Sequence, residues 1–248
     1  MPTPKEVLSI ATYLGYNMLR HGAEISRVED TVSRICLSYK MDEAHVFAVY
    51  STLIISVSKD GETLTQTRRV NSISTNLDRV DRLNDLSRRI CSICPSYEEA
   101  IQEIKDIERR KIYHPMLTVL AYALIAGSFA IFFGGDLKDG VVALGVGVAV
   151  RLVMLLLEKM KMAPFFITMA ASAVVTALAY LAGGLLRGIN IDTVIIGTLM
   201  NLVPGVAITT SMRDFISTDY MCGMSRVTEA LLTAASIAIG ASVMLIWQ

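Results

Sequence analysis

The sequence predicts an α+β cytosolic domain followed by an all-α membrane domain of five transmembrane helices. Two observations support this fold class. Of the 46 charged residues, 32 lie in residues 1–111 and only 14 in residues 112–248. The second part also repeats apolar runs of about 20 residues, the length that a helix needs to cross roughly 30 Å of hydrocarbon. We therefore expect two domains, residues 1–111 and residues 112–248.

The first part predicts four helices and a small sheet. In the second helix, apolar residues recur every three or four positions and give one apolar face. The sequence KDGE, between the last two strands, is typical of a hairpin turn. Pro95, Ser96 and Glu99 form a capping-box pattern at the start of the last helix. The expected helices cover 4–20, 24–40, 76–92 and 97–111, and the expected strands cover 45–50, 52–58 and 63–70.

Few patterns in the first part indicate catalysis. The chain has no GxxxxGK, GxSxG or HExxH motif. Cys91 and Cys94 form a CxxC pair, but no second pair completes a zinc site, so we expect structural cysteines, no metal and no cofactor. The N-terminus lacks the apolar core of a secretory signal, which predicts that this domain stays in the cytosol. Balanced charge in each part argues against nucleic-acid binding.

The second part predicts five spans, at residues 114–134, 139–158, 162–186, 192–212 and 225–247. Basic residues in the links set the orientation of such spans, because Lys and Arg concentrate on the cytoplasmic side. With a cytosolic N-terminus, only Lys138 and Arg187 fall outside. The expected location is the bacterial inner membrane, with the C-terminus outside. The basic residues on the inner side are then Arg109, Arg110, Lys111, Lys159, Lys161, Arg213 and Arg226.

Small residues spaced four apart predict close packing between the spans. Ala143 and Gly147 share one face of the second span, and Ala173 and Ala177 share one face of the third. Small side chains let helix backbones approach closely. The pattern fits a bundle around a transport path, but it favours an ordinary compact bundle.

The fourth span carries a polar stripe. At 100° per residue, Thr198, Asn201, Gly205, Thr209 and Arg213 fall within about 120° of one continuous helix. Pro204 cannot donate a backbone hydrogen bond to Met200, so the helix should kink or open there. Transporters commonly bind substrate at such broken helices. We therefore predict that Asn201, Pro204, Gly205, Thr209 and Arg213 bind substrate. The alternative is a kinked, packed helix whose threonines bond to their own turn.

Four further charged residues are candidates for coupling or gating. Arg151 lies within the second span, where it can reach towards the membrane surface or neutralise an anionic group inside the bundle. Asp214 lies at the end of the fourth span. Arg226 and Glu229, three residues apart, lie on one face of the fifth span.

Three segments, in this order, resemble the N-terminal part of the threonine/serine exporter family. They are HGAEISRVEDTVSRI (21–35), TQTRRVNSISTNLDRVDRLNDLSRRI (65–90) and LVPGVAITTSMRDFISTDYMCGMSRVTEALL (202–232), and the resemblance covers nearly the whole chain. The family pattern falls on Gly22, Glu24, Arg27, Glu29, Arg68 and Arg69 in the first part. In the second part it falls on Pro204, Gly205, Asp214, Gly223, Arg226 and Glu229.

The resemblance implies a subunit of a secondary exporter for small carboxylate-bearing metabolites, either threonine and serine or a C4-dicarboxylate such as succinate. Full-length members carry a second, smaller membrane module, so the expected partner is a small membrane protein that carries that module. A homo-oligomer would also bury the surface of the membrane domain that the second module would otherwise cover. No nucleotide site is visible, so we expect an ion gradient to drive export, with Asp214 or Glu229 as the proton-carrying acid. The alternatives are a membrane-tethered enzyme with chemistry in the first domain and a non-transporting regulatory subunit.

Overall fold

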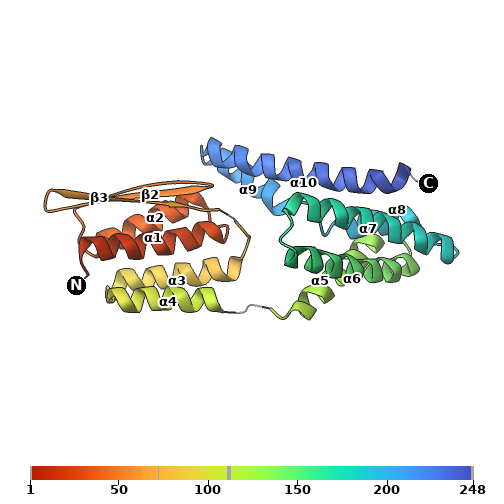
Figure 1. The fold of residues 1–248 in the computed structure, drawn as a ribbon, viewed down its shortest axis with the longest axis horizontal. Helices are drawn as coiled ribbons and strands as arrows, with labels where there is room; N and C mark the ends of the chain where they lie inside the picture. Colours follow the sequence, from red (N-terminus) through yellow and green to blue (C-terminus); the bar gives the residue numbers. More distant parts are fainter. Residues whose placement is uncertain (1, 72, 111–112, 247–248) are drawn as a thin grey trace. The chain divides into compact units, whose positions relative to one another are not determined.

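The computed structural model describes residues 2–71, 73–110 and 113–246 and divides into two compact units, Met1–Ile112 (unit 1) and Tyr113–Gln248 (unit 2) (Figure 1). The expected boundary between residues 111 and 112 falls outside the described residues. Unit 1 contains α1 (Pro4–Arg20), α2 (Ile25–Ser38), β1 (Glu43–Val49), β2 (Thr52–Lys59), β3 (Glu62–Arg69), α3 (Leu77–Ile93) and α4 (Tyr97–Arg109). Each of these elements was predicted. The expected end of α4, at residue 111, lies outside the described residues.

The sheet of unit 1 is antiparallel, in the order β1-β2-β3. Lys59 pairs with Glu62 across the predicted turn, and Asp60 and Gly61 have φ angles of 51° and 82°. Two residues with positive φ are what a tight type I′ hairpin requires, and the DG sequence supplies them. The capping box predicted at Ser96 is also confirmed, with the hydroxyl accepting from the Glu99 N–H.

Unit 1 is built in three layers, with α1 and α2 between the sheet and the pair α3 and α4 (Figure 1). Leu53, Ile55 and Val57 of β2 are buried on the sheet face that α1 and α2 cover. Because α1 is covered from both sides, Ile10 and Leu14 are completely buried. A middle-layer helix needs apolar residues around much of its circumference, which the sequence of α1 provides.

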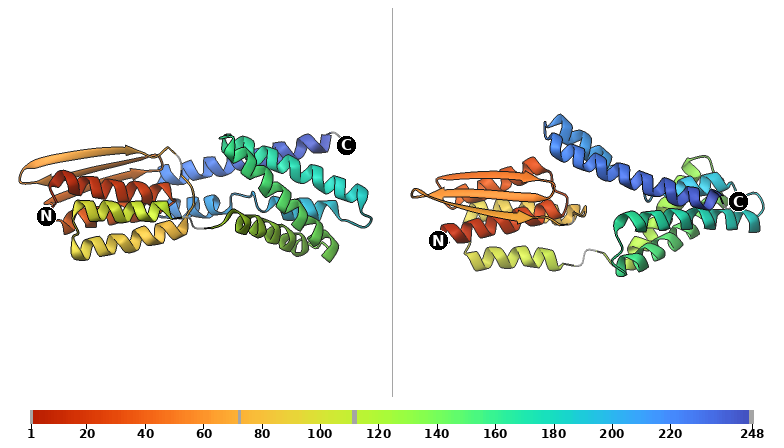
Figure 2. Two further views of the ribbon diagram at one scale, coloured as in Figure 1. Left: turned by 60° about the horizontal axis from the view of Figure 1, so that its bottom comes forward. Right: turned by 45° about the horizontal axis from the view of Figure 1, so that its top comes forward.

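The described residues of unit 2 form helices joined by short links, with no strand. Its elements are α5 (Pro115–Phe132), α6 (Leu137–Lys159), α7 (Pro164–Leu185), α8 (Ile191–Leu199), α9 (Gly205–Ile216) and α10 (Tyr220–Ile246). Within the described ranges, four of these helices, α5, α6, α7 and α10, are long and apolar enough to cross a membrane. The fourth predicted span, 192–212, is not one helix but the pair α8 and α9, and α10 packs against α7 and α9 (Figure 2).

The last helix begins five residues earlier than predicted. Asp219 caps it, since its carboxylate accepts from the Cys222 N–H and its carbonyl from the Gly223 N–H. An aspartate at this position stabilises a helix start, which explains why α10 begins at Tyr220 rather than at residue 225. The predicted end at residue 247 lies outside the described residues.

The core of unit 2 is made of small and branched side chains. Ala143 is fully buried and a Cβ on Gly147 would lie 2.8 Å from the Tyr122 carbonyl, so the packing face predicted for the second span is confirmed. The face predicted for the third span is wrong. In α7, Ala171, Val175 and Ala179 are fully buried, whereas Ala177 is exposed. An evenly apolar helix has no polar face to identify its buried side.

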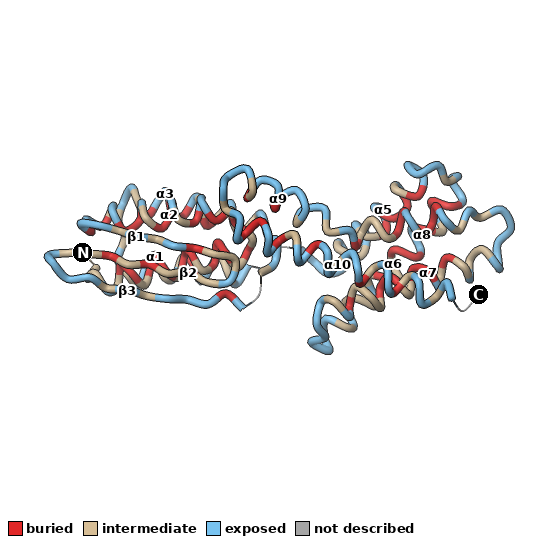
Figure 3. Tube along the Cα trace, turned by 90° about the horizontal axis from the view of Figure 1, so that it is seen from above, coloured by how far each residue is buried: buried red, intermediate tan, exposed pale blue. Residues whose placement is uncertain are grey.

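Large apolar side chains cover the outside of unit 2. Leu124 and Leu152 are more than half exposed, as are many other large apolar residues. Figure 3 shows the buried positions on the inward faces of the helices. A soluble protein rarely exposes apolar surface on this scale. The surface suits contact with lipid or with another membrane protein.

Candidate functional site

The break between α8 and α9 is the most unusual backbone feature of unit 2. The helix ends at Leu199, the next begins at Gly205, and Pro204 occupies the N-cap of α9. The Gly205 N–H donates to the Val203 carbonyl at 2.8 Å rather than to the carbonyl four residues earlier. The opening predicted from Pro204 is therefore confirmed. The predicted polar stripe is wrong as a continuous helical face, because residues before and after the break no longer share one axis.

Asn201 lies inside this break and is held by its amide nitrogen. Nδ2 donates to the carbonyls of Tyr122 and Thr198, each at 3.2 Å. Because carbonyls only accept, these two bonds fix which end of the amide is nitrogen. The amide oxygen Oδ1 is buried, and no described residue donates to it. Thr198, fully buried on α8, likewise has a hydroxyl without a partner among the described residues.

Arg151 approaches the same region from α6. Its guanidinium lies 5.1 Å from the centre of the Tyr122 ring, and Nη1 donates to Glu158 at 2.9 Å. The side chain is only 15% exposed, and its Nε is buried without a partner in the described part of the chain. Glu158 lies next to the end of α6 and is 45% exposed, so this pair is compatible with both roles expected for Arg151 and decides between neither. Tyr122 thus contacts both Arg151 and Asn201.

These residues form what we call the break cluster: Tyr122, Arg151, Thr198 and Asn201. It offers one acceptor, the Asn201 oxygen, and two donors, the Thr198 hydroxyl and the Arg151 Nε. Buried polar atoms without partners are uncommon in folded proteins and call for an explanation. Sequence reasoning identified Arg151, Thr198 and Asn201 but not Tyr122, since a tyrosine in an apolar run gives no signal of its own.

The other predicted substrate residues lie apart from the break cluster. Gly205 and Thr209 are exposed on α9, and the Thr209 hydroxyl donates to the Gly205 and Val206 carbonyls of its own helix. For this threonine the alternative of bonding to its own turn is correct. Arg213 is also exposed, at the end of α9. A Cβ on Gly205 would meet no atom within 4 Å, so packing inside unit 2 does not require glycine there.

Asp214 and Arg226 form a buried ion pair between α9 and α10. The Asp214 Oδ2 and Arg226 Nε atoms are 2.9 Å apart, and the side chains are 6% and 10% exposed. Gly223 lies against the ring of Phe215, where a Cβ would come within 2.7 Å of a ring carbon. Glu229 is exposed on α10. Three family positions, Asp214, Gly223 and Arg226, therefore join α9 to α10.

Several family positions in unit 1 stabilise its fold. Gly22 has a φ of 83°, which favours glycine in the turn after α1. The Glu29 carboxylate accepts from the Ala48 N–H at 2.8 Å and so satisfies a backbone donor on the edge strand β1. Arg68 stacks on Tyr16, 4.8 Å from the ring centre. Three other positions do not share this pattern: Glu24 is the N-cap of α2 without a side-chain cap bond, and Arg27 and Arg69 are exposed.

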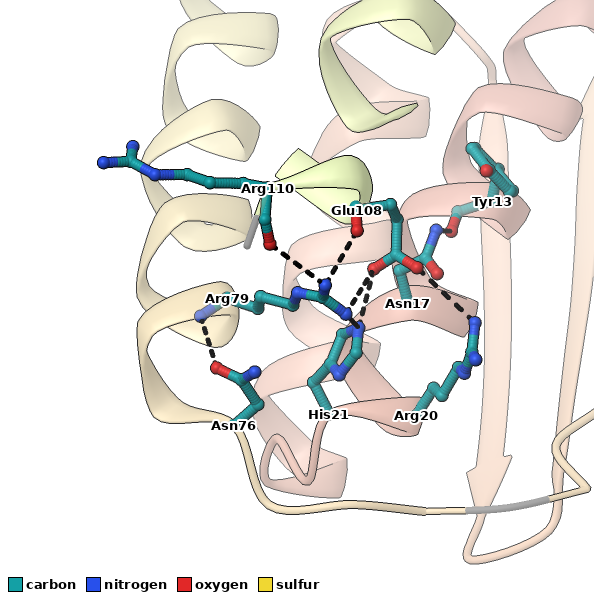
Figure 4. Close-up of polar contacts among 8 residues, drawn as sticks. All are labelled: Tyr13, Asn17, Arg20, His21, Asn76, Arg79, Glu108 and Arg110. Atoms are coloured by element: carbon teal, nitrogen blue, oxygen red, sulfur yellow. Dashed lines mark hydrogen bonds and ion pairs between the residues drawn. The ribbon is translucent and has the colours of Figure 1, made fainter. Parts of the chain in front are cut away.

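Sequence reasoning missed a buried polar cluster in unit 1 (Figure 4). His21 Nε2 lies 2.6 Å from a Glu108 oxygen, so the imidazole donates from this nitrogen. Arg20 pairs with the same carboxylate at 3.4 Å. Arg79 donates to the carbonyls of Glu108 and Arg110 at 2.7 and 3.3 Å, which fastens the end of α4 to α3. Burial lowers the pKa of His21, although the nearby carboxylate acts in the opposite direction.

The three cysteines of unit 1 are buried or half-buried free thiols. Among the described residues no group of three His, Cys, Asp or Glu side chains could hold a metal ion. Cys94 caps α3 in the left-handed region, with a φ of 46°, and its thiol donates to the Ser38 carbonyl at 3.3 Å. Burial raises the pKa of the Cys36 thiol to about 12 and also raises that of Cys91. Raised pKa values keep thiols protonated at neutral pH, which slows their alkylation and oxidation.

The chain matches proteins named as exporters and transporters. The "Probable threonine/serine exporter" of Mycobacterium tuberculosis is 24% identical over 95% of this chain, and the match covers 45% of that protein. The "Probable succinate transporter subunit YjjP" of Klebsiella aerogenes is 24% identical over 90% of this chain and 86% of that protein. The chain therefore spans less than half the length of the first relative and most of the second.

No solved structure gives a significant match. The long apolar helices and the relatives together indicate a membrane protein. The family model of the threonine/serine exporters, ThrE, matches residues 9–247. The chain belongs to the threonine/serine exporter family.

Proposed function

We propose that the chain is a subunit of a secondary exporter that moves small carboxylate-bearing metabolites out of the cell, and that the break cluster contacts the cargo. The names of both relatives support export, and family membership leaves the cargo open. The observation that carries the proposal is the Asn201 amide. Its nitrogen is committed to two carbonyls, and its oxygen is buried without a donor among the described residues.

The polarity of the break cluster favours threonine and serine over a dicarboxylate. An amino acid carries an ammonium group, and serine and threonine also carry a hydroxyl, so each can donate to the Asn201 oxygen. The carboxylate of the same molecule can accept from the Thr198 hydroxyl and the Arg151 Nε. Succinate at neutral pH has only acceptors. It would leave the Asn201 oxygen unpaired, and sites built to hydrogen-bond a donor reject analogues that lack it.

We propose that α8 and α9 together make the fourth of five membrane crossings, interrupted at residues 200–204. Broken helices of this kind are tolerated at membrane depth where their free backbone groups face protein or a wet cavity. The basic residues in the links favour a cytosolic N-terminus and an outside C-terminus. Reporter fusions after residues 160 and 219 should then report the cytosol, and fusions after 137 and 189 the outside. The same side reported from residues 189 and 219 would contradict the crossing at α8 and α9.

We propose that a small membrane protein carrying the second module of the family completes the exporter. The relative from Klebsiella aerogenes is named a subunit, and this chain aligns with 86% of it. Purified alone in liposomes, the chain should show little counterflow, and adding the partner should restore it. Full counterflow by the chain alone would contradict this proposal and leave a homo-oligomer as the explanation.

We propose that Asp214 carries the coupling proton. Because Asp214 pairs with buried Arg226, protonating the carboxylate would neutralise one member of the pair and loosen the joint between α9 and α10. Glu229, on α10, is the second candidate acid. An inward proton gradient should therefore accelerate export by the wild type but not by Asp214→Asn. Unchanged gradient dependence in that variant would assign coupling elsewhere.

The sharpest test of the break cluster is Thr198→Val. The substitution removes a buried hydroxyl that has no partner among the described residues, so the melting temperature should rise or stay unchanged. Counterflow of threonine, measured with the partner present, should nevertheless fall about tenfold, the loss expected for one hydrogen bond of about 1.4 kcal/mol. Thr209→Val is the matched control, since its hydroxyl bonds only to its own helix. Equal transport by both variants would remove Thr198 from the site.

A further inference from the structure

Unit 1 contains a cavity of about 390 Å³ between α2 and α3 that the proposed export function does not use. Each helix contributes four lining residues with the spacing i, i+3, i+4 and i+7, so each presents one face to the cavity. The volume suits a small metabolite. The lining residues are Arg27, Asp30, Thr31 and Arg34 of α2 and Asn84, Ser87, Arg88 and Cys91 of α3.

The charge of this cavity is unbalanced. Arg34 donates to Asp30 at 2.8 Å, and this pair accounts for the only carboxylate in the lining. Arg27 and Arg88 have no ion-pair or hydrogen-bond partner among the described residues. Two guanidinium groups therefore remain uncompensated, in a chain whose formal net charge is zero. Both side chains are exposed and line one cavity, and an anion bound between them would reduce the repulsion of their like charges.

Polar groups that could orient a ligand line the same cavity. The Asn84 side chain makes no hydrogen bond to a described residue, and neither does the Thr31 hydroxyl. Ser87 is 5% exposed and donates to the Asn84 carbonyl at 2.6 Å, which leaves its oxygen able to accept. Arginine is the side chain best suited to carboxylate and phosphate, because its planar fork donates two parallel hydrogen bonds.

We propose that this cavity binds a small dianionic metabolite, a dicarboxylate or a phosphate compound, between Arg27 and Arg88. The site is separate from the break cluster and needs neither the partner protein nor transport. It gives a role to Arg27, a family position whose side chain makes no ion pair or hydrogen bond with a described residue. The shared chemistry is a pair of negative charges, which one bound molecule presents to the two guanidinium groups.

The test is equilibrium binding to the purified full chain in detergent, by calorimetry at low ionic strength. The probes are succinate and inorganic phosphate, with threonine as the zwitterionic comparison. The wild type should bind at least one of the two dianions saturably and tighter than threonine. Tighter succinate binding would assign a dicarboxylate, and tighter phosphate binding a phosphorylated metabolite. Saturable binding of neither dianion would overturn the proposal.

Arg27→Gln and Arg88→Gln should each weaken binding about tenfold or more, the loss of one charge-assisted contact. Arg89→Gln is the matched control. It removes the same charge from the next residue of α3, whose side chain pairs with Glu103 of α4 instead. Equal weakening by all three variants would mean that the anion senses net charge only, which also overturns the site. Asn201→Leu, a change in the break cluster, should leave dianion binding unchanged. A failure of the dianion site can therefore be distinguished from a failure of the export proposal.

Alkylation supplies a second readout that does not depend on affinity. Cys91 lines the cavity and Cys94 does not. Saturating dianion should slow modification of Cys91 by iodoacetamide at least several-fold, measured by peptide mass spectrometry, and leave Cys94 unchanged. Equal rates for Cys91 with and without the bound dianion would place the ligand outside this cavity.

Discussion

Removing the charge of Asp214 should destabilise unit 2 strongly. In the substitution Asp214→Asn the side chain keeps its shape, but the Arg226 guanidinium, 10% exposed, loses its carboxylate partner. Breaking a buried ion pair from one side costs about 3–5 kcal/mol, because the other charge stays buried. For a chain of this length, each kcal/mol corresponds to about 2–4 °C in melting temperature, so we expect a decrease of about 10 °C.

The assay is thermal unfolding of the purified chain in one detergent, followed by intrinsic fluorescence. Asp192→Asn is the control, since it neutralises an exposed carboxylate in the first turn of α8. The double variant Asp214→Asn/Arg226→Gln should recover more than half of the loss, because no buried charge remains. Additive destabilisation in the double variant, or an equal decrease in Asp192→Asn, would refute the argument that the two buried charges stabilise each other.

Three further predictions follow from the geometry. Pro204→Ala should leave insertion and stability intact but reduce counterflow sharply, because a continuous helix would bond the backbone groups that the break frees; wild-type counterflow would make the break a packing feature. Gly197→Ala should lower the melting temperature, because its Cβ would meet the backbone of Ala130, whereas Gly205→Ala, into open space, should not; equal effects would contradict the packing described for α8. Burial lowers the pKa of His21 in the folded state, so the unfolded chain takes up its proton first as the pH falls below about 6.5. The stability of unit 1 should be full above that pH and decrease below it, and His21→Gln should flatten the decrease in melts between pH 7.5 and 5.5.

The features that could be predicted from the sequence are those encoded by neighbouring residues. Asp60 and Gly61 specify a hairpin, Ser96 and Glu99 specify a helix start, and Pro204 interrupts a helix. Each depends on residues within a few positions, so one sequence contains the whole signal.

The features that could not be predicted depend on distant residues. Asn201 donates to Tyr122, 79 positions away, and His21 meets Glu108, 87 positions away. The spacing of apolar and polar residues along the sequence does not predict such contacts. The polar stripe failed for a related reason: projecting residues at 100° assumes one uninterrupted helix, and the same proline that predicted the break invalidated the projection.

The length of α10 affects where the proposed coupling proton would cross the membrane potential. A helix of 27 residues is about 40 Å long, roughly 10 Å more than the hydrocarbon layer. In the proposed orientation, an excess at the cytosolic end places Arg226, in the second turn, at the boundary of that layer. A proton passing from Asp214 to the cytosol would then not cross the electric field of the membrane. The full membrane potential, worth about 2.3 kcal/mol per charge at 100 mV, would then lie between Asp214 and the outside.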